Sequence, residues 1–332
     1  MKGMVSLPRK RIMSGMRPTG RLHLGNYLGA LENWVRLQDE YECFFCVVDW
    51  HALTTGYEDT SDIRANIREM AVDWLSAGLD PERSTFYVQS RVKEIAELHL
   101  LLSMVTPVSW LERVPTYKDQ LQQLAAKDIN TYGFLGYPLL QTADIVIFKA
   151  DFVPVGEDQL PHLELAREIV RRFNNFYGPI FPEPQPKLNQ VTMLPGIDGR
   201  KMSKSYGNDI SMAAAAEDIK SRVDMMITDP ARIRKSDPGH PEVCTVHSFH
   251  GAFSRDELAQ IELDCRAGQI GCVQCKRNLT ARLQAVMAPL QERRSRYIER
   301  PELVDEILAA GSEKARRVAA ATMEQVRAAM RI

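Results

Sequence analysis

The sequence predicts an α/β fold with a parallel sheet, a helical insertion and an all-helical C-terminal domain. Three observations support this prediction. In residues 11–89, short apolar runs typical of buried parallel strands alternate with stretches of helical periodicity. Residues 94–136 are mostly helical in pattern and interrupt this alternation, and after residue 211 the pattern becomes almost entirely helical. The β-α-β-α-β order corresponds to one half of a Rossmann-like sheet.

The length of 332 residues favours two domains. We expect a Rossmann-like domain at residues 1–210, with the helical insertion at about 94–136. A helical domain at 211–310 would follow, and a C-terminal helix at 311–332 would pack back on the body of the protein.

The composition is that of an ordinary globular protein in water, with 45% hydrophobic and 26% charged residues. The net charge is −1, so a polyanionic partner would have to bind local basic patches. No apolar run approaches the length of a membrane span, and the N-terminus lacks the apolar segment of a secretory signal. We therefore expect a cytoplasmic protein that has no membrane partner.

The first predicted strand, residues 11–14, leads through a turn rich in glycine and proline at 15–20 into a helix. His23, Gly25 and Asn26 fall in the first turn of that helix. A helix that follows a strand in a parallel sheet directs its amide groups and its dipole toward a phosphate. Alternatively, His23 is a hydrogen-bonded residue that caps the helix. The helical spacing comes from Leu24, Tyr27, Leu28, Leu31, Trp34 and Val35.

The second predicted strand, residues 43–49, contains a Cys-x-x-Cys pair that invites a metal-site interpretation. Residues three apart on a strand point to opposite faces, so we expect Cys43 and Cys46 to be core residues. His51 follows at the carboxyl end of the strand, where open α/β sheets bind ligands. A pocket residue and a packed core residue are equally good interpretations of His51.

A carboxylate stands in an apolar setting on the helix that begins near residue 137. Tyr137, Gln141 and Asp144 share one face of this helix, and residues 145–148 are all apolar. A buried carboxylate needs a partner. Asp144 therefore either pairs with an arginine or lysine, or accepts a hydrogen bond from a substrate donor such as an indole N–H. The second arrangement would reject phenylalanine, because its side chain has no N–H group.

The next predicted strand, residues 152–156, ends at a turn that carries Gly156, Glu157, Asp158 and Gln159 before another helix. Acidic groups at this turn could accept hydrogen bonds from a ribose hydroxyl or a substrate ammonium. They could equally be ordinary acids at a helix N-terminus, which the helix dipole favours. Taken singly, they fit the second interpretation better.

A short loop at residues 198–205 carries two lysines, Lys201 and Lys204, after the flexible Gly199. A lysine pair of this kind on a loop is usually a solvated surface. Two ammonium groups so close together also suit a triphosphate, and the loop could tighten as charge develops on the phosphates. The full run Lys-Met-Ser-Lys-Ser at 201–205 is far more specific than the lysine pair alone.

Two motifs together resemble the class I aminoacyl-tRNA synthetases. The Lys-Met-Ser-Lys-Ser run is similar to their signature loop, and His-Leu-Gly-Asn at 23–26 is similar to their first motif, with Asn26 as a tolerated departure. Residues 137–174 are very similar to one family in this class, the tryptophanyl-tRNA synthetases. The resemblance extends from Ser14 to the last helix.

The resemblance implies ATP-dependent ligation of L-tryptophan to tRNA(Trp) through tryptophanyl-adenylate, with Mg²⁺ on the ATP and a homodimeric assembly. It implies that the chemistry is carried by Arg17, His23, Lys201 and Lys204. It places ATP on Arg17, Pro18, Thr19, Gly25, Asn26, Gly156, Glu157, Asp158, Met193, Lys201, Met202, Ser203, Lys204 and Ser205. It places tryptophan on His51, Tyr137, Gln141, Asp144 and Gln159. Arg17 stands where many bacterial members have glutamine, which would add positive charge beside the α-phosphate.

The C-terminal domain contains a Cys-x20-Cys-x6-Cys-x2-Cys pattern. Four thiolates suit a [4Fe–4S] cluster or tetrahedral zinc, although four unrelated thiols are the alternative. A subset of the family carries a [4Fe–4S] cluster at similar cysteines, which favours the cluster here. The four residues are Cys244, Cys265, Cys272 and Cys275. Basic residues of this domain could track tRNA phosphates or form a solvated face: Lys276, Arg277, Arg282, Arg293, Arg294 and Arg296.

Three other functions compete with this one. A tyrosine-specific ligase of the same class would form an adenylate with tyrosine instead. A small-molecule nucleotidyltransferase with the same two motifs would not charge tRNA. A non-catalytic paralogue that senses tryptophan would not exchange pyrophosphate with ATP, and the two intact motifs argue against it.

Overall fold

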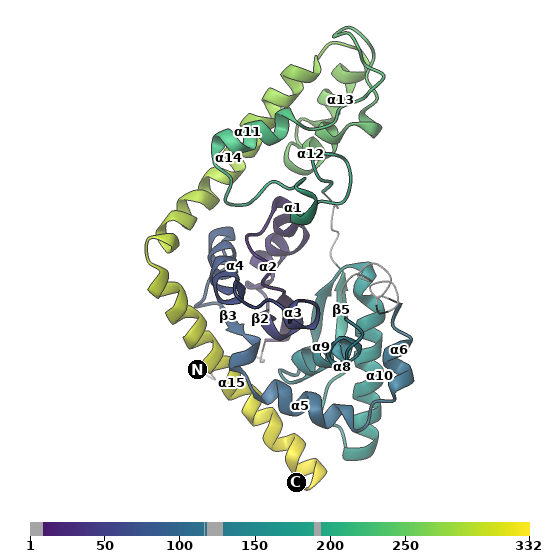
Figure 1. The fold of residues 1–332 in the computed structure, drawn as a ribbon, viewed down its shortest axis with the longest axis vertical. Helices are drawn as coiled ribbons and strands as arrows, with labels where there is room; N and C mark the ends of the chain where they lie inside the picture. The colour runs from purple at the N-terminus through teal and green to yellow at the C-terminus, as the bar shows by residue number, and fades with distance from the viewer. Residues whose placement is uncertain (1–8, 116, 118–128, 189–193) are drawn as a thin grey trace, which may run out of the picture.

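The structure is a computed structural model that describes residues 9–115, 117, 129–188 and 194–332. In this part of the chain, five strands form one parallel sheet with the order β3-β2-β1-β4-β5 (Figure 1). The strands are β1 (Arg11–Met16), β2 (Glu42–Val47), β3 (Ser84–Val88), β4 (Phe152–Val155) and β5 (Gln185–Leu188). The predicted Rossmann-like α/β fold is thus confirmed.

The sheet is buried on both faces, which explains its near-continuous apolar strands. Cys43 and Cys46 of β2 are both buried but belong to different hydrophobic clusters. They therefore lie on opposite faces of the sheet, and the predicted role as core cysteines is confirmed. Burial raises the pKa of the Cys43 thiol to about 12.

The strand order reverses between β1 and β4. The chain runs outward from β1 to β2 and β3, and then returns to the other side of β1 to form β4 and β5. The register places Ile12 of β1 opposite Cys43 on one side and Phe152 on the other. Helices that leave the two sides diverge at such a switch point, which leaves a crevice at the carboxyl ends of the strands.

Helical segments connect the strands of the first half. One continuous helical segment follows β1 and includes a π-helical turn. The longest of these helices, α4, ends at Gly78, which is left-handed with a φ of 106°. These segments are α1 (Leu24–Asn26), the π turn (Tyr27–Leu31), α2 (Glu32–Leu37), α3 (Asp49–Gly56), α4 (Ile63–Ala77) and η2 (Gln89–Arg91).

The described part of the predicted insertion contains three short helices between β3 and α9. They are α5 (Glu94–Ser103), α6 (Val108–Glu112) and α8 (Tyr132–Leu135). α9 (Tyr137–Val146) starts with a proline in its first turn, where the missing N–H costs nothing. α10 (Leu160–Tyr177) follows β4 through the turn η3 (Glu157–Gln159) and buries one apolar face.

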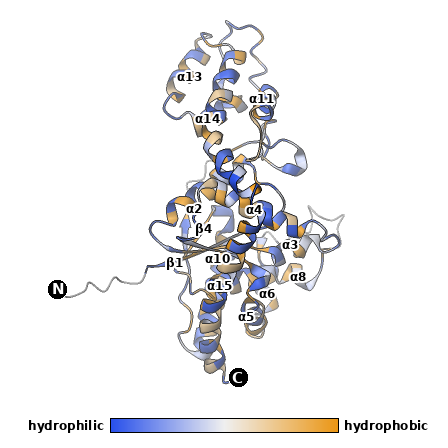
Figure 2. Ribbon diagram, turned by 90° about the vertical axis from the view of Figure 1, so that its left-hand side faces the viewer, coloured by the Kyte–Doolittle hydropathy of each residue, from blue (hydrophilic) through white to orange (hydrophobic). Residues whose placement is uncertain are grey.

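Helices dominate the C-terminal third. Figure 2 shows α11, α13 and α14 at the end of the molecule away from the sheet. The elements are η4 (Lys204–Tyr206), α11 (Ala216–Asp224), η5 (Pro241–Val243), α12 (Thr245–Phe253), α13 (Leu258–Arg266), α14 (Cys272–Ile298) and α15 (Pro301–Met330).

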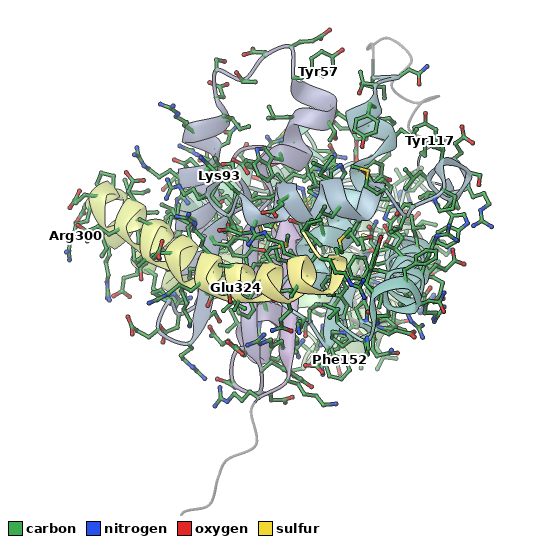
Figure 3. The ribbon with its side chains drawn as sticks, turned by 90° about the horizontal axis from the view of Figure 1, so that it is seen from below. Tyr57, Lys93, Tyr117, Phe152, Arg300 and Glu324 are labelled. Carbon is green, nitrogen blue, oxygen red and sulfur yellow. The ribbon has the colours of Figure 1, made fainter. Side chains whose placement is uncertain are left out.

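The last helix, α15, covers the edge of the sheet at β3. Figure 3 shows it crossing the molecule from Arg300 past Glu324. Gly311 packs directly on the backbone of Phe86, and the Ser312 hydroxyl accepts a hydrogen bond of 3.2 Å from the Val88 N–H. Covering an edge strand in this way removes a surface that would otherwise pair with another chain. The boundary expected at residue 310 falls inside this helix.

Candidate active site

A cavity of about 390 Å³ opens at the switch point, between the ends of β1 and β4 and the face of α9. This volume lies in the range of small-molecule sites. Arg17 and all five residues that the sequence assigned to tryptophan line it. The lining residues are Met13, Ser14, Gly15, Arg17, Val48, His51, Tyr137, Gln141, Asp144, Ile145, Val153, Pro154, Val155, Gln159 and His162.

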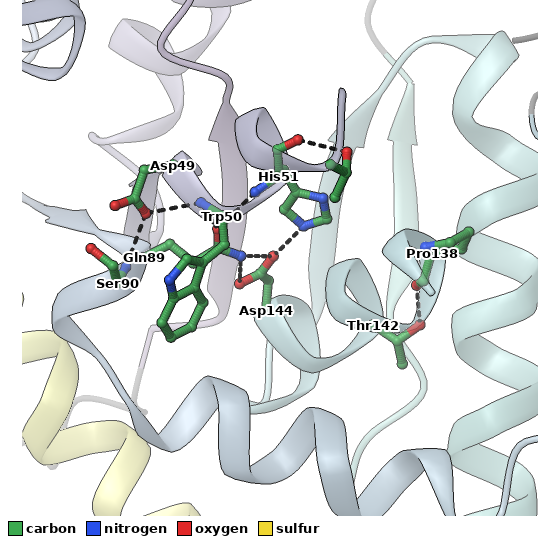
Figure 4. Close-up of polar contacts among 9 residues, drawn as sticks. Asp49, Trp50, His51, Gln89, Ser90, Pro138, Thr142 and Asp144 are labelled. Carbon is green, nitrogen blue, oxygen red and sulfur yellow. Dashed lines mark hydrogen bonds and ion pairs between the residues drawn. The ribbon is translucent and has the colours of Figure 1, made fainter. Parts of the chain in front are cut away.

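Asp144 is 1% exposed and is held by two side chains, His51 and Gln89 (Figure 4). The His51 Nε2 atom lies 2.9 Å from Asp144 Oδ2, and the Gln89 Nε2 atom lies 2.8 Å from each carboxylate oxygen. Within the described residues no arginine or lysine pairs with Asp144. His51 combines the two roles proposed for it, because it is buried and also lines the cavity.

A second hydrogen-bonded chain starts from Tyr137, which lies on the same face of α9 as Asp144. The Tyr137 hydroxyl lies 3.0 Å from His162 Nε2, and His162 Nδ1 lies 3.0 Å from the side-chain oxygen Oε1 of Gln159. The Gln159 amide in turn donates to Asp158 at 2.9 Å. Burial lowers the pKa of His162, which favours the neutral imidazole at neutral pH. This chain links the tyrosine of the cavity to the exposed turn before α10.

Arg17 brings a positive charge into the cavity. Burial lowers the pKa of its guanidinium, while the charge of Tyr137 acts in the opposite direction. No carboxylate forms an ion pair with Arg17 within the part of the chain that the structure describes. A half-buried guanidinium of this kind matches a carboxylate or phosphate from a ligand.

The turn at His23 is a capping box. The Asn26 N–H donates to His23 Nδ1 at 3.3 Å, and the His23 N–H donates to the Asn26 side-chain oxygen at 3.1 Å. A Cβ on Gly25 would lie 3.0 Å from the same imidazole, so a side chain there would push the ring away. Burial lowers the pKa of His23, assisted by the charge of Lys204 and opposed by that of Asp209.

The lysine loop lies against the N-terminal turn. Lys204 Nζ donates to the Thr19 carbonyl at 2.5 Å and to its hydroxyl at 3.4 Å. The Met202 sulfur would lie 3.4 Å from a Cβ on Gly25. Burial lowers the pKa of Lys204, and the charges of Asp209 and Asp73 oppose that shift. The two signature motifs therefore meet in space.

The other described residues expected to bind ATP lie outside the cavity. Lys201, Glu157 and Asp158 are exposed, and Ser203 and Ser205 bond each other through their hydroxyls at 2.8 Å. A Cβ on Gly156 would lie 2.7 Å from Asp158 Oδ1, which explains the glycine at this tight turn. None of these residues lines the cavity. Pro18 is buried within the N-terminal turn. Met193 lies outside the described residues.

Comparison with known proteins agrees with this geometry. The family model described as "tRNA synthetases class I (W and Y)" matches residues 8–288. The tryptophan–tRNA ligase of Thermotoga maritima is 53% identical, with coverage of 97% of this chain and 99% of the relative. The ligase of Aquifex aeolicus is 46% identical, with coverage of 97% and 100%.

The structural comparison gives the same answer. A crystal structure of tryptophanyl-tRNA synthetase from Campylobacter jejuni, complexed with ADP and tryptophan, superposes with a TM-score of 0.87 at 33% identity. That match covers 97% of this chain and 100% of the other. The chain belongs to the tryptophanyl-tRNA synthetase family. The resemblance inferred from its motifs is confirmed.

Two of the four cysteines predicted as metal ligands, Cys265 and Cys272, lie beside Arg232. The guanidinium lies 3.7 Å from Cys265 Sγ and 4.0 Å from Cys272 Sγ. Burial, followed by the charges of the other three thiols, raises the pKa of Cys275 to about 12. In the described part of the chain, no group of three or more His, Cys, Asp or Glu residues forms a metal site as it stands.

The basic residues expected to contact tRNA mostly bond within the synthetase itself. Lys276 donates to the Asp224 carbonyl, Arg282 pairs with Asp256, and Arg296 pairs with Glu292. Arg294 is buried, and Arg293 donates to the Ser76 carbonyl. Arg277 instead lines a cavity of about 450 Å³ at the start of α14, together with Arg232, Arg234 and Lys235.

Three further residues organise the site and were not predicted from the sequence. Gln89 donates a hydrogen bond to Asp144. Asn208 holds the lysine loop through hydrogen bonds to Asp198, Lys201 and Ser203. Asp73 accepts a hydrogen bond of 2.7 Å from the N–H of Leu22, next to His23. All three are buried polar residues. Their positions in ordinary strand, loop and helix patterns gave no signal. Asp73 alone could have been suspected, because it stands between Val72 and Trp74 in the mostly apolar second half of its helix.

Proposed function

We propose that the chain ligates L-tryptophan to tRNA(Trp) with ATP, through a tryptophanyl-adenylate. The observation that carries this proposal is the cavity at the switch point, which has a buried carboxylate at one wall and an arginine at another. Membership of the family and the tryptophan–tRNA ligase relatives support the choice of substrates. A tyrosine-specific ligase is disfavoured because the relatives that match over nearly full length are tryptophan ligases.

Tryptophan would bind with its indole N–H toward Asp144. A carboxylate accepts hydrogen bonds only, and an indole N–H donates only, so the pair is complementary. Tyr137, Gln141, Gln159 and His51 complete the walls. Substrates without a donor would leave a buried acceptor unpaired, which discriminates far better than an apolar wall.

ATP would lie over the His23 turn, with its phosphates between that turn and the lysine loop. Lys204 already contacts Thr19 there, and Lys201 belongs to the same loop. The tryptophan carboxylate then attacks the α-phosphorus, and pyrophosphate leaves. Positioning and charge stabilisation suffice for this step, without a covalent intermediate on the protein. His23, Gly25, Asn26, Gly156, Glu157 and Asp158 would shape the nucleotide site.

Mg²⁺ would arrive on the ATP phosphates. Proteins commonly bind this ion through substrate phosphates with few ligands of their own. Bound there, the ion would neutralise charge on the phosphates.

We further propose that residues 211–310 bind the tRNA anticodon region, with the basic residues around the start of α14 as the contact. Residues 1–210 would form the catalytic domain, and 311–332 would anchor its sheet edge. Exposed apolar residues on the insertion and α10 suit a homodimer interface: Leu100, Met104, Val108 and Phe176. No described helix could span a membrane. We place the protein in the cytoplasm, where tRNA is charged.

We propose that Cys244, Cys265, Cys272 and Cys275 hold a [4Fe–4S] cluster, with zinc as the alternative. Burial and the charges of the other three thiols raise the pKa of Cys275, and a cationic side chain beside Cys265 and Cys272 would offset the negative charge of a thiolate-bound group. Such a group would fasten α13 and the start of α14 to Cys244, which lies directly before α12. Anaerobic purification with an absorbance spectrum and metal analysis tests this. A colourless protein free of iron and zinc would exclude both groups.

The function is tested by pyrophosphate exchange with ATP, measured with tryptophan and with tyrosine, followed by aminoacylation of tRNA(Trp). We expect exchange and charging with tryptophan only. Exchange with tyrosine would indicate the tyrosine-specific ligase. Exchange without charging would indicate a nucleotidyltransferase, and no exchange at all would indicate a tryptophan sensor.

A further inference from the structure

Gln89 is fully buried at the end of β3 and makes four hydrogen bonds around the candidate indole acceptor. Its Nε2 atom donates to both oxygens of Asp144 at 2.8 Å. Its Oε1 atom accepts from the backbone N–H groups of Trp50 at 3.1 Å and His51 at 3.4 Å (Figure 4). Gln89 does not line the cavity, so it acts on a ligand only through its neighbours.

The two backbone donors fix the orientation of this side chain. A backbone N–H can only donate, so the side-chain atom facing Trp50 and His51 must be the carbonyl oxygen. The amide nitrogen then faces Asp144. Asp49 strengthens the arrangement, because its carboxylate accepts from the N–H groups of Trp50 at 3.1 Å and Ser90 at 3.0 Å. The start of α3 and the end of β3 therefore lock Gln89 in one rotamer.

The contacts on Asp144 leave room for one more donor. An ionised carboxylate has about four acceptor positions. Oδ2 receives His51 and Gln89, whereas Oδ1 receives Gln89 alone within the described residues. Because Asp144 lines the cavity, the open position on Oδ1 is available to a ligand. Gln89 bridges both oxygens and so sets the plane of the carboxylate.

We propose that Gln89 is the positioning residue for indole recognition: it holds Asp144 as an acceptor with one oxygen open to the substrate N–H. The inference rests on the proposed function. It extends that function by assigning specificity to a residue that touches no substrate. Without Gln89, Asp144 would lose the donor that bridges its two oxygens and could turn toward His51 alone.

The test compares tryptophan with 3-benzothienylalanine, in which sulfur replaces the indole N–H. The ratio of kcat/KM for the two amino acids, measured by pyrophosphate exchange, reports recognition of the N–H. Gln89→Glu keeps an oxygen for Trp50 and His51 but loses the donor to Asp144. Gln89→Leu loses both. We expect the ratio to fall at least about tenfold in both variants, with the KM for ATP unchanged.

A purely structural role for Gln89 makes a different prediction. Gln89→Glu would then keep the wild-type ratio, since the contacts to the α3 backbone survive, and this result would overturn the inference. Gln38→Leu is the matched control, because Gln38 is equally buried and bonds Gly78 and Asp80 far from the cavity. Its ratio should equal that of the wild type. If Gln89→Leu does not fold, the glutamate variant decides alone.

The wild-type measurement separates this inference from the proposed function. Absence of tryptophan-dependent exchange would overturn the function and, with it, the inference. Normal exchange with a high preference for tryptophan, combined with an unchanged ratio in Gln89→Glu, would overturn the inference alone.

Discussion

Arg17 and Asp144 give the cavity two walls of opposite charge. An amino acid with an N–H donor on its ring and a carboxylate at its other end would fit between them in only one orientation. The same arginine would remain useful during the reaction, because the carboxylate becomes bound to a phosphoryl group that also carries negative charge. We therefore propose that Arg17 faces the reacting end of the substrate and Asp144 its ring end.

Arg17→Gln should lower kcat/KM for adenylate formation by about tenfold to a hundredfold, as expected for one hydrogen bond to a charged group. The change removes the charge and leaves a shorter, uncharged donor. Pyrophosphate exchange with varied tryptophan and ATP measures it. Arg21→Gln is the control, since Arg21 is largely exposed and pairs with Glu69. Equal rates for wild type and Arg17→Gln would show that Arg17 only fills space.

At the residue scale, the sequence predicts the groups that face the cavity better than those behind them. Asp144 was identifiable because a carboxylate among apolar neighbours requires a partner. Its partner was not identifiable, because Gln89 follows an ordinary strand and its role depends on three elements meeting in space. A hydrogen bond across 55 residues has no local signature.

At the scale of elements, the lysine loop is the part that should respond to the reaction. Lys204→Ala should lower kcat about a hundredfold and change the KM for ATP by only a few-fold, because its charge matters most when pyrophosphate leaves. Exchange assays with varied ATP measure both constants. Lys220→Ala, on the surface of α11, is the control. Equal losses in kcat and ATP affinity would contradict a role in the transition state.

The contact between α15 and β3 depends on one glycine. A Cβ on Gly311 would lie 1.9 Å from the Phe86 carbonyl, so Gly311→Ala must push the helix away from the strand. We expect a loss of about 3 kcal/mol in the free energy of unfolding, measured in urea. Gly251→Ala in α12 is the matched control, because a Cβ there meets only Leu258 at 3.9 Å. It should be neutral or stabilise by up to about 1 kcal/mol.

If both helical glycines tolerate alanine equally, α15 does not dock tightly on the sheet. That outcome would also weaken the proposal that residues 311–332 anchor the edge of the catalytic domain.

Elements with a strong pattern could be predicted from the sequence, and elements without one could not. The first four strands are apolar and lie close to the expected positions. β5 went unrecognised because Gln185–Leu188 is a half-exposed edge strand that contains a proline. Likewise, the helix expected at 311–332 begins earlier, at Pro301, where a proline occupies its first turn.

At the scale of the whole molecule, buried imidazoles make stability depend on pH. Burial lowers the pKa of five histidines: His23, His99, His162, His247 and His250. As the pH falls below about 6.5, the unfolded chain gains protons at these positions before the folded protein does. Their contribution to stability is therefore present near neutral pH and is lost as the pH falls.

One buried carboxyl acts in the opposite direction. Burial, only partly offset by the charge of Arg294, raises the pKa of Asp73 to about 6, so its ionisation opposes folding as the pH rises through that value. Acidification from pH 7 to 5 therefore has two opposing effects on the free energy of unfolding: the five histidines lower it, and Asp73 raises it. The histidines should prevail, and the free energy of unfolding in urea should decrease steadily over this range. His250→Gln, which removes an imidazole that is 1% exposed, should make the decrease shallower. A wild type that becomes more stable between pH 7 and 5 would show that Asp73 dominates instead.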